Sequence, residues 1–469
     1  MSMEMPNIVP EEIAKPKEQG EEPFPVSDIE DISERKLSSV ALRLQELFPE
    51  QSERIGEIAD SFLKSVHSEL LEANDEIREK GLPELDKKSL DAIELFYQLK
   101  AEKQIRGCLP LEAKKAVYQY FKDIAGVIEK KEKTDKSIPE LSNPVLKNTL
   151  FQKLDNGEMA ARIPLNKEKT DVDFLIVSKN DIDQYCFYIL STLPKAELNK
   201  KQQAELDAYL EKNQESKSSI NIKKLLSIVR VNPVLLDQFK SRFERDVANR
   251  ERYTKRKVRE TAGMLSVVFK DRNEGEKFLD LCTGTGDIAT IIKTLGPQIK
   301  GVDLNKYYLK VGRIYDTILK KKFGSQENER HLSEADVING ELPDADVWIA
   351  KHPCAPHMAL PDEIIRKFSE NSTANQLYLL TCCANKSVGH CPHSYNQNGL
   401  ISSEEWNQSC LASSDIGTEE EHGKIEKVQE ALKKINNARI RYIRDVLHLD
   451  AELVEIPGTI MNQMIIVRK

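Results

Sequence analysis

The sequence lacks any long apolar run. No stretch approaches the roughly 18 consecutive apolar residues that a membrane-spanning helix needs. The first residues also lack the basic and apolar regions of a secretion signal. With 39% hydrophobic residues and a mean hydropathy of −0.51, the composition is that of a soluble globular chain. We therefore expect a cytoplasmic protein that makes no membrane contact.

Cysteine is sparse as well. The eight cysteines form no regular framework of the kind found in disulfide-rich secreted domains, so we interpret them as reduced thiols or site residues. The sequence shows no clear internal repeat. At 469 residues, the chain should hold about two or three domains.

The net negative charge of the chain comes from its first residues. Residues 1–34 carry ten acids, two lysines and five prolines, a balance of −8 that equals the charge of the whole chain. We predict a disordered acidic tail over residues 1–36. Apolar residues at helical spacing predict a mostly helical region over 37–232, with one short strand near Asp171–Val177. Residues 233–469 form the remaining predicted domain.

The most informative segment reads FLDLCTGTGDIA, from Phe278 to Ala289, followed by IKGVDL from Ile299 to Leu304. It predicts a buried strand, a glycine turn, a helix start and a second strand that ends on a carboxylate. Asp303 stands 17 residues after Gly286, where doubly wound sheets place an acid that accepts hydrogen bonds from ribose hydroxyls. The predicted fold class is therefore α/β, with a Rossmann-like doubly wound sheet behind a mostly α-helical N-terminal region.

Two cofactors fit such a turn. Gly284, Gly286 and Ala289 match the loose pattern of nicotinamide enzymes, but Asp280 would face a pyrophosphate with like charge. The segment resembles motif I of class I S-adenosylmethionine-dependent methyltransferases, with Cys282 where that family usually has its first glycine. The resemblance implies S-adenosyl-L-methionine as cofactor. The predicted cofactor-binding residues are Asp280, Cys282, Thr283, Gly284, Gly286, Asp303, Leu304 and Asp336.

Reactive groups in an open α/β sheet lie beyond the carboxyl ends of the strands. The fourth and fifth predicted strands are Ala345–Ala350 and Gln376–Thr381, so the candidates are KHPCAPH, residues 351–357, and CCANK, residues 382–386. A late helix with an apolar stripe places Arg439 on that stripe. This guanidinium should either point into the site or pair with an acid beneath it.

These segments resemble the tRNA acceptor-stem 2′-O-ribose methyltransferases, whose signatures AKHLCG, CCHHR and GR-x-x-YL correspond here to AKHPCA, CCANK and the helix around Arg439. The resemblance implies methylation of a tRNA ribose hydroxyl, a reaction that needs one proton acceptor and good positioning. We rank Lys351 above His352 as that acceptor. The predicted catalytic residues are Lys351, His352, Cys354, Cys382 and Arg439.

Two alternatives remain open. Pro353-Cys354 and Thr381-Cys382 are similar to the elements of RNA 5-methylcytosine methyltransferases, in which a thiolate attacks the pyrimidine ring. The second alternative is not an enzyme. Nine of the sixteen Cys and His residues lie between His352 and Cys410, and a zinc-stabilised, degenerate methyltransferase fold could bind RNA. Their spacing is irregular, and we predict no metal ligands.

A basic stretch precedes the glycine turn. Residues 240–259 hold nine Lys or Arg and three acids, with aromatic residues between them. This pattern predicts contact with an RNA phosphate backbone through Arg252, Lys255, Arg256 and Arg259. An ordinary solvated helix face is the alternative.

Overall fold

The computed structural model describes residues 52–133, 144–146, 149–154, 158–164, 174–191, 193, 198–204, 206, 227–229, 232–270, 272–324, 331–353, 360–381, 387–413, 422–457 and 462–469. The predicted acidic tail lies outside these ranges. No helix in the described part of the chain is long and apolar enough to cross a membrane.

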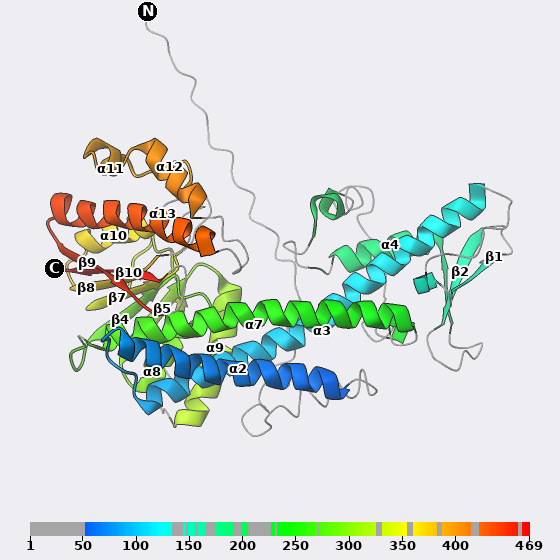
Figure 1. The fold of residues 1–469 in the computed structure, drawn as a ribbon, viewed down its shortest axis with the longest axis horizontal. Coiled ribbons are helices and arrows are strands. Elements are labelled where there is room, and N and C mark those ends of the chain that lie inside the picture. The colour runs from blue at the N-terminus through cyan, green and yellow to red at the C-terminus, as the bar shows by residue number, and fades with distance from the viewer. Residues whose placement is uncertain are drawn as a thin grey trace, which may run out of the picture.

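Three long helices make up most of the N-terminal part: α2 (Ser52–Glu79), α3 (Lys87–Lys133) and α7 (Pro233–Lys270). Helix α7 packs against both α2 and α3, and Figure 1 shows the three running together below the large sheet. Their inward faces supply Phe62, Phe96 and Phe239 to the main core. Because α3 also contacts α8 and α9 of the sheet domain, the helical region packs directly on that domain.

A small sheet lies at the far end of α3. It consists of β1 (Leu150–Lys153), β2 (Met159–Pro164) and β3 (Phe174–Ser178), paired antiparallel in the order β1-β2-β3. Helix α4 (Lys179–Ser191) follows β3, and a short turn, η4 (Pro144–Leu146), precedes β1. The sequence predicted one strand in this region, and the structure adds β1 and β2.

The large sheet has seven strands in the order β6-β5-β4-β7-β8-β10-β9. Strands β4 to β8 are parallel, whereas β10 pairs antiparallel with both β8 and β9. This mostly parallel arrangement is the Rossmann-like sheet of class I methyltransferases and confirms the predicted fold class. The strand bounds are β4 (Lys277–Leu281), β5 (Gln298–Asp303), β6 (Leu332–Glu334), β7 (Val347–Lys351), β8 (Gln376–Leu380), β9 (Asp450–Glu455) and β10 (Gln463–Arg468).

Helices connect and cover these strands. Helix α9 begins after Asn305, whose side chain accepts hydrogen bonds from the amides of Tyr307 and Tyr308, and it ends at Gly324 in the left-handed conformation. Asparagine at the N-cap and a left-handed glycine at the C-cap are both favoured at helix ends. The bounds are α8 (Asp287–Leu295), α9 (Lys306–Phe323), α10 (Leu360–Glu370), α11 (His393–Gln397), α12 (Ser403–Ala412) and α13 (His422–Arg441), with a π-helical turn, η7 (Tyr442–Val446).

Side chains of each strand alternate between two cores. On β7, Val347 and Ile349 pack into the core shared with α3, α7 and α8, while Trp348 and Ala350 pack on the opposite side with α10. Because the side-chain period of a strand is two, Lys351 shares the face of Ile349. The last residue of β7 therefore points toward the long N-terminal helices.

Candidate functional site

The glycine turn connects β4 to α8. Gly284 and Gly286 have φ angles of 55° and 73°, in the left-handed region that favours glycine. A Cβ atom added to Gly284 would meet no atom within 4 Å, so the backbone here borders open space that a ligand could fill. At Gly286 an added Cβ would lie 3.0 Å from Leu332, which leaves no room for a side chain.

Cys282 adopts a left-handed backbone conformation, which glycine tolerates best. Its φ is 57°, which costs a residue with a Cβ about 1–2 kcal/mol. His352, at the end of the neighbouring strand β7, has a φ of 51°. Strained residues at two adjacent strand ends mark this edge of the sheet as a functional site, because such strain persists where function requires it.

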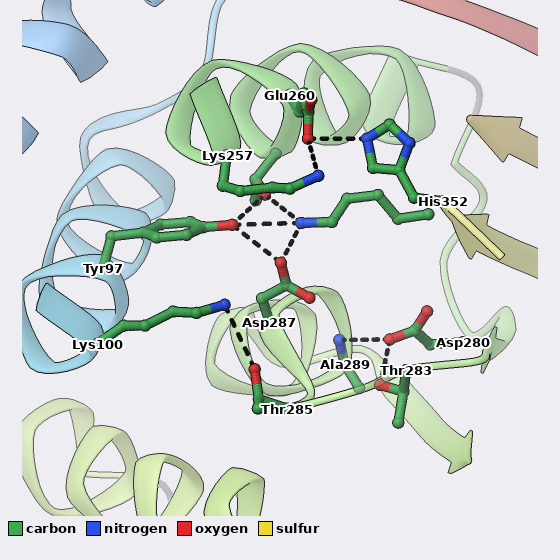
Figure 2. A network of polar contacts seen from close by, with 12 residues as sticks. Tyr97, Lys100, Lys257, Glu260, Asp280, Thr283, Thr285, Asp287, Ala289 and His352 are labelled. Carbon is green, nitrogen blue, oxygen red and sulfur yellow. Dashed lines mark hydrogen bonds and ion pairs between the residues drawn. The ribbon is translucent and has the colours of Figure 1, made fainter. Parts of the chain in front are cut away.

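Asp280 lies beneath the turn. Its carboxylate is 1% exposed and accepts hydrogen bonds from the Thr283 hydroxyl and the Ala289 amide, as Figure 2 shows. The sequence placed Asp280 and Thr283 among the cofactor-binding residues. In the structure these two residues are hydrogen-bonded to each other beneath the turn and stabilise its backbone. Burial raises the pKa of Asp280 to about 7.

This pKa makes a pH-dependent contribution to stability. Since the folded-state pKa exceeds the ordinary value of 3.8, the contribution is fully present below that value and is lost as the pH rises toward about 7. We expect wild type to lose on the order of 3 kcal/mol more than Asp280→Asn between pH 4.5 and pH 8. Urea unfolding of both proteins at the two pH values measures this difference. Equal pH dependence in the two proteins would contradict it.

Asp303 stands beside the turn at the end of β5. Its two oxygens accept hydrogen bonds from the amides of Gly284 and Asn305, each at 2.8 Å. An ionised carboxylate offers about four acceptor positions, so capacity for two hydroxyl groups remains. Leu304 is 62% exposed next to it, an apolar surface of the kind that an adenine ring can cover.

Asp336 follows β6, the next strand along the sheet. Its carboxylate accepts hydrogen bonds from the side chain and amide of Asn339 and from the amide of Ile338. These bonds lower the pKa of Asp336 and keep it ionised. The structure thus brings Gly284, Asp303, Leu304 and Asp336 to one edge of the sheet, as the sequence predicted from the order of the strands.

A buried polar network lies on the other side of the turn (Figure 2). Lys351, whose side chain is 8% exposed, forms an ion pair with Asp287 at the start of α8. Its ammonium also donates to the Thr261 hydroxyl at 2.8 Å and to the Tyr97 hydroxyl at 3.2 Å. The Tyr97 hydroxyl in turn donates to Asp287 at 2.9 Å. Burial alone would raise the pKa of Asp287, but the charges of Lys351 and Lys100 lower it.

His352 belongs to a second, adjacent cluster. Its Nε2 lies 2.8 Å from Glu260 Oε2 on α7, and Lys257 Nζ is 2.6 Å from the same oxygen. Burial would raise the pKa of Glu260, but the contacts with His352 and Lys257 lower it and keep the carboxylate ionised. Burial lowers the pKa of His352, so the imidazole is neutral at pH 7. Both ring nitrogens of His352 are buried, and neither meets hydrogen-bond geometry with a partner within the described chain.

The two candidate proton acceptors, of which the sequence ranked Lys351 first, differ in their contacts. Lys351 contacts one carboxylate and two hydroxyls, so its nitrogen is occupied as an ammonium donor. His352 is neutral, and its Nδ1 has neither a hydrogen bond nor an ion-pair contact within the described chain. The physical reason is the pleat of β7, which turns Lys351 toward the helices and away from the edge of the sheet.

Arg439 is held in a buried ion pair. Its guanidinium, in a side chain 2% exposed, donates to both oxygens of Asp362 on α10, at 2.9 and 2.8 Å. It also donates to Asn436 at 3.0 Å and lies over the ring of Trp406. Of the two arrangements that the sequence left open, the structure has the pairing with an acid.

The two proposed thiol nucleophiles, Cys354 and Cys382, lie outside the described residues. In the described ranges, no group of three or more His, Cys, Asp or Glu side chains is arranged to hold a metal ion. Cys391 and Cys410 are described, and burial raises the pKa of both thiols.

The basic stretch lies on α7, and part of it faces inward. Arg259 forms ion pairs with Glu69, Glu72 and Glu76 of α2. Two further predicted contacts have partners within α7: Lys255 lies 3.1 Å from Glu251, and Arg256 lies 3.6 Å from Glu260. Arg252 is exposed. The predicted RNA-contacting residues therefore differ in how much of their charge is free for a partner.

Sequence reasoning missed the residues that surround Lys351. Tyr97 and Lys100 come from α3 and Glu260 and Thr261 from α7, and no pattern in the chain connects them to the glycine turn. Asp287 was the one available signal, since a carboxylate directly after Gly286 begins the helix that the turn predicts.

The strand order, the glycine turn and Asp303 together define a methyltransferase-like Rossmann fold. No protein-family model and no curated protein matches the sequence. Solved structures resemble it distantly. One is a Pyrococcus horikoshii OT3 protein, 11% identical, covering 44% of this chain and 87% of its own, with a TM-score of 0.26.

Two other similar structures are methyltransferases in complex with S-adenosyl-L-homocysteine. The Pyrococcus abyssi tRNA (uracil-54, C5)-methyltransferase is 11% identical over 45% of this chain, with a TM-score of 0.25, and this chain spans 38% of its length. The magnesium protoporphyrin IX methyltransferase of Synechocystis PCC 6803 is 12% identical over 45% of this chain and 82% of its own, with a TM-score of 0.26.

Proposed function

We propose that the protein is an S-adenosylmethionine-dependent methyltransferase that acts on RNA, with a ribose 2′-hydroxyl as the methyl acceptor. The main support for the cofactor assignment is the open space at Gly284. This space lies beside the Asp303 carboxylate, at the carboxyl ends of two adjacent parallel strands. Ligands of open α/β sheets bind at this position.

The residues at this edge fit the cofactor by their chemistry. Asp303 would accept the ribose hydroxyls, and the exposed Leu304 would cover one face of the adenine. When bound, the cofactor supplies an electrophilic methyl group on a cationic sulfur. The buried Asp280 tolerates that charge, whereas it would disfavour a pyrophosphate at the same turn.

His352 is the side chain that best fits the proton acceptor. Methylation of a hydroxyl requires removal of its proton as the new bond forms. The contact with Glu260 fixes the imidazole with Nε2 toward the carboxylate and leaves Nδ1 to accept a proton. Lys351 acts beside it as a positioning residue that holds the end of β7 against α8.

The outer face of α7 supports RNA as the substrate. Arg245 and Arg252 are exposed, have no partner among the described residues, and stand seven residues apart, on one face of the helix. Tyr253 is 45% exposed beside them, with Arg256 lying over its ring at 5.2 Å. Basic side chains next to an exposed aromatic ring suit a phosphate backbone and a stacked base.

The cofactor assignment can be tested by calorimetry with S-adenosylhomocysteine. Asp303→Ala is expected to weaken binding by roughly 100-fold or more, because two charge-assisted hydrogen bonds to ribose are lost. The matched control is Glu334→Ala, which removes an exposed carboxylate from the end of the neighbouring strand β6. Unchanged affinity in Asp303→Ala, or tight binding of NAD by wild type, would contradict the assignment.

The substrate assignment needs a separate experiment. Wild-type protein is incubated with methyl-labelled S-adenosylmethionine and total RNA, and the RNA is then digested to nucleosides. Label in a 2′-O-methylnucleoside is the expected result. Label in 5-methylcytidine would favour the thiolate alternative instead, and unlabelled RNA would overturn the substrate class.

A further inference from the structure

Lys100 is a partly buried cation that forms no ion pair with any of the described residues. It projects from α3 to the glycine turn, where its Nζ lies 3.5 Å from the Thr285 hydroxyl, and its other contact is with the ring of Tyr97 at 5.7 Å. Among the described residues, no carboxylate lies within ion-pair distance of it. The Thr285 hydroxyl stands between the two glycines of the turn.

The nearby anions already have cations of their own. Asp287 pairs with Lys351, and Glu260 contacts both Lys257 and His352. With Arg256, which lies 3.6 Å from Glu260, the cluster contains four Lys or Arg side chains and two carboxylates. A partly buried ammonium without an ion-pair partner is unfavourable, which favours an anion that completes the cluster in the functional protein.

The lowered pKa of Lys100 is consistent with a site that an anion completes. The pKa of its ammonium is lowered from 10.5 to about 8, mainly by burial; the charges of Lys351 and Lys257 also lower it, whereas Asp287 and Glu260 raise it. Tyr97 is the other titratable group packed against it, and burial raises the pKa of that phenol, so it stays neutral. The folded protein therefore disfavours the charged form of Lys100 relative to the unfolded chain.

We propose that Lys100 binds the carboxylate of the amino-acid portion of S-adenosylmethionine, so that the N-terminal helical region completes the cofactor site. This inference rests on the proposed function. Asp303 contacts Gly284 and Lys100 contacts Thr285, so the two side chains flank consecutive residues of one turn. A ligand with its ribose at Asp303 and an anionic end at Lys100 would lie along that turn. A phosphate group of the substrate is the other source of the same chemistry.

Two ligands that differ in the amino-acid portion separate these sources. S-Adenosylhomocysteine carries the carboxylate, and 5′-methylthioadenosine lacks it. In calorimetry, Lys100→Met should weaken S-adenosylhomocysteine binding by roughly 10- to 100-fold, the range for one charge-assisted hydrogen bond, and leave 5′-methylthioadenosine binding unchanged. The matched control is Lys87→Met, an exposed lysine at the start of the same helix. It should change neither affinity.

Thermal unfolding without ligand gives an independent readout. Because the Lys100 ammonium is disfavoured in the folded protein at pH 7, Lys100→Met should raise the melting temperature while it weakens cofactor binding. If Lys100 had a purely structural role, Lys100→Met would have a lower melting temperature than wild type. That result would overturn the inference.

The possible failures can be told apart. If wild type binds no S-adenosylhomocysteine, the proposed function fails and this inference fails with it. If wild type and Lys100→Met bind it equally well, only this inference fails. Weaker binding of a mixed-sequence RNA by Lys100→Met, with unchanged S-adenosylhomocysteine affinity, would assign the anion to a substrate phosphate and overturn the carboxylate assignment.

Discussion

Lys351→Met is expected to lower the free energy of unfolding by about 3–5 kcal/mol, because it leaves the Asp287 carboxylate buried without its main cation. The two side chains are 8% and 12% exposed, so water cannot replace the lost ammonium. Urea unfolding at pH 7 measures the change. The matched control is Lys434→Met, which removes an exposed pair with Glu430 and should cost less than about 1 kcal/mol.

Removing both charges separates stability from chemistry. Lys351→Met combined with Asp287→Leu should recover much of the lost stability, since apolar groups of similar volume can replace a buried ion pair. With His352 as the proton acceptor, this double variant should keep methyl transfer within about tenfold of wild type. A loss of about 10² or more in a stable double variant would return the acceptor role to Lys351. Wild-type stability in the single variant would contradict the structural role.

Arg439→Met is expected to cause a loss of similar size. It leaves Asp362 buried, with the Tyr395 hydroxyl at 2.6 Å as the side-chain donor that remains to it among the described residues, and it removes the guanidinium from the Trp406 ring. Breaking a buried pair of this kind costs about 3–5 kcal/mol. Arg439→Met with Asp362→Leu should be more stable than the single variant.

Arg366 provides the matched control for Arg439. Its guanidinium also contacts two carboxylates, those of Glu363 and Glu370. Unlike the side chain of Arg439, that of Arg366 is 44% exposed. Arg366→Met should therefore change the free energy of unfolding by less than about 1 kcal/mol. Equal effects of the two substitutions would show that burial of the Arg439 pair does not govern its contribution.

Short sequence patterns made it possible to predict the large sheet and the edge of it that carries Gly284 and Asp303. The glycines of the turn, the carboxylate of Asp303 and the caps of α9 at Asn305 and Gly324 depend on the conformation of a few adjacent residues. Strands β1 and β2 were missed because LFQK and MAARIP are short and lack a regular alternation of apolar and polar residues.

Partners that are distant in the chain could not be predicted. Tyr97 contacts Lys351 across 254 positions, and Arg439 contacts Asp362 across 77, so only the folded chain brings them together. The direction of Lys351 was available in principle, because Ile349 on the same strand is a core residue two positions earlier. The ranking of Lys351 over His352 rested on a family match and a cationic side chain, and it did not use this alternation.

Helix α3 limits how the protein can be divided. Its C-terminal part contacts β2 and α4, and in its first third Tyr97 contacts Asp287 at the start of α8 and Lys100 contacts Thr285 of the glycine turn. A fragment that begins at Pro233 would keep Asp303 and all strands of the large sheet, yet it would open Lys351 to water and uncover the apolar side of α8. The portable unit, for gene fusion or for recombination in evolution, is therefore larger than the sheet that carries the recognisable motif.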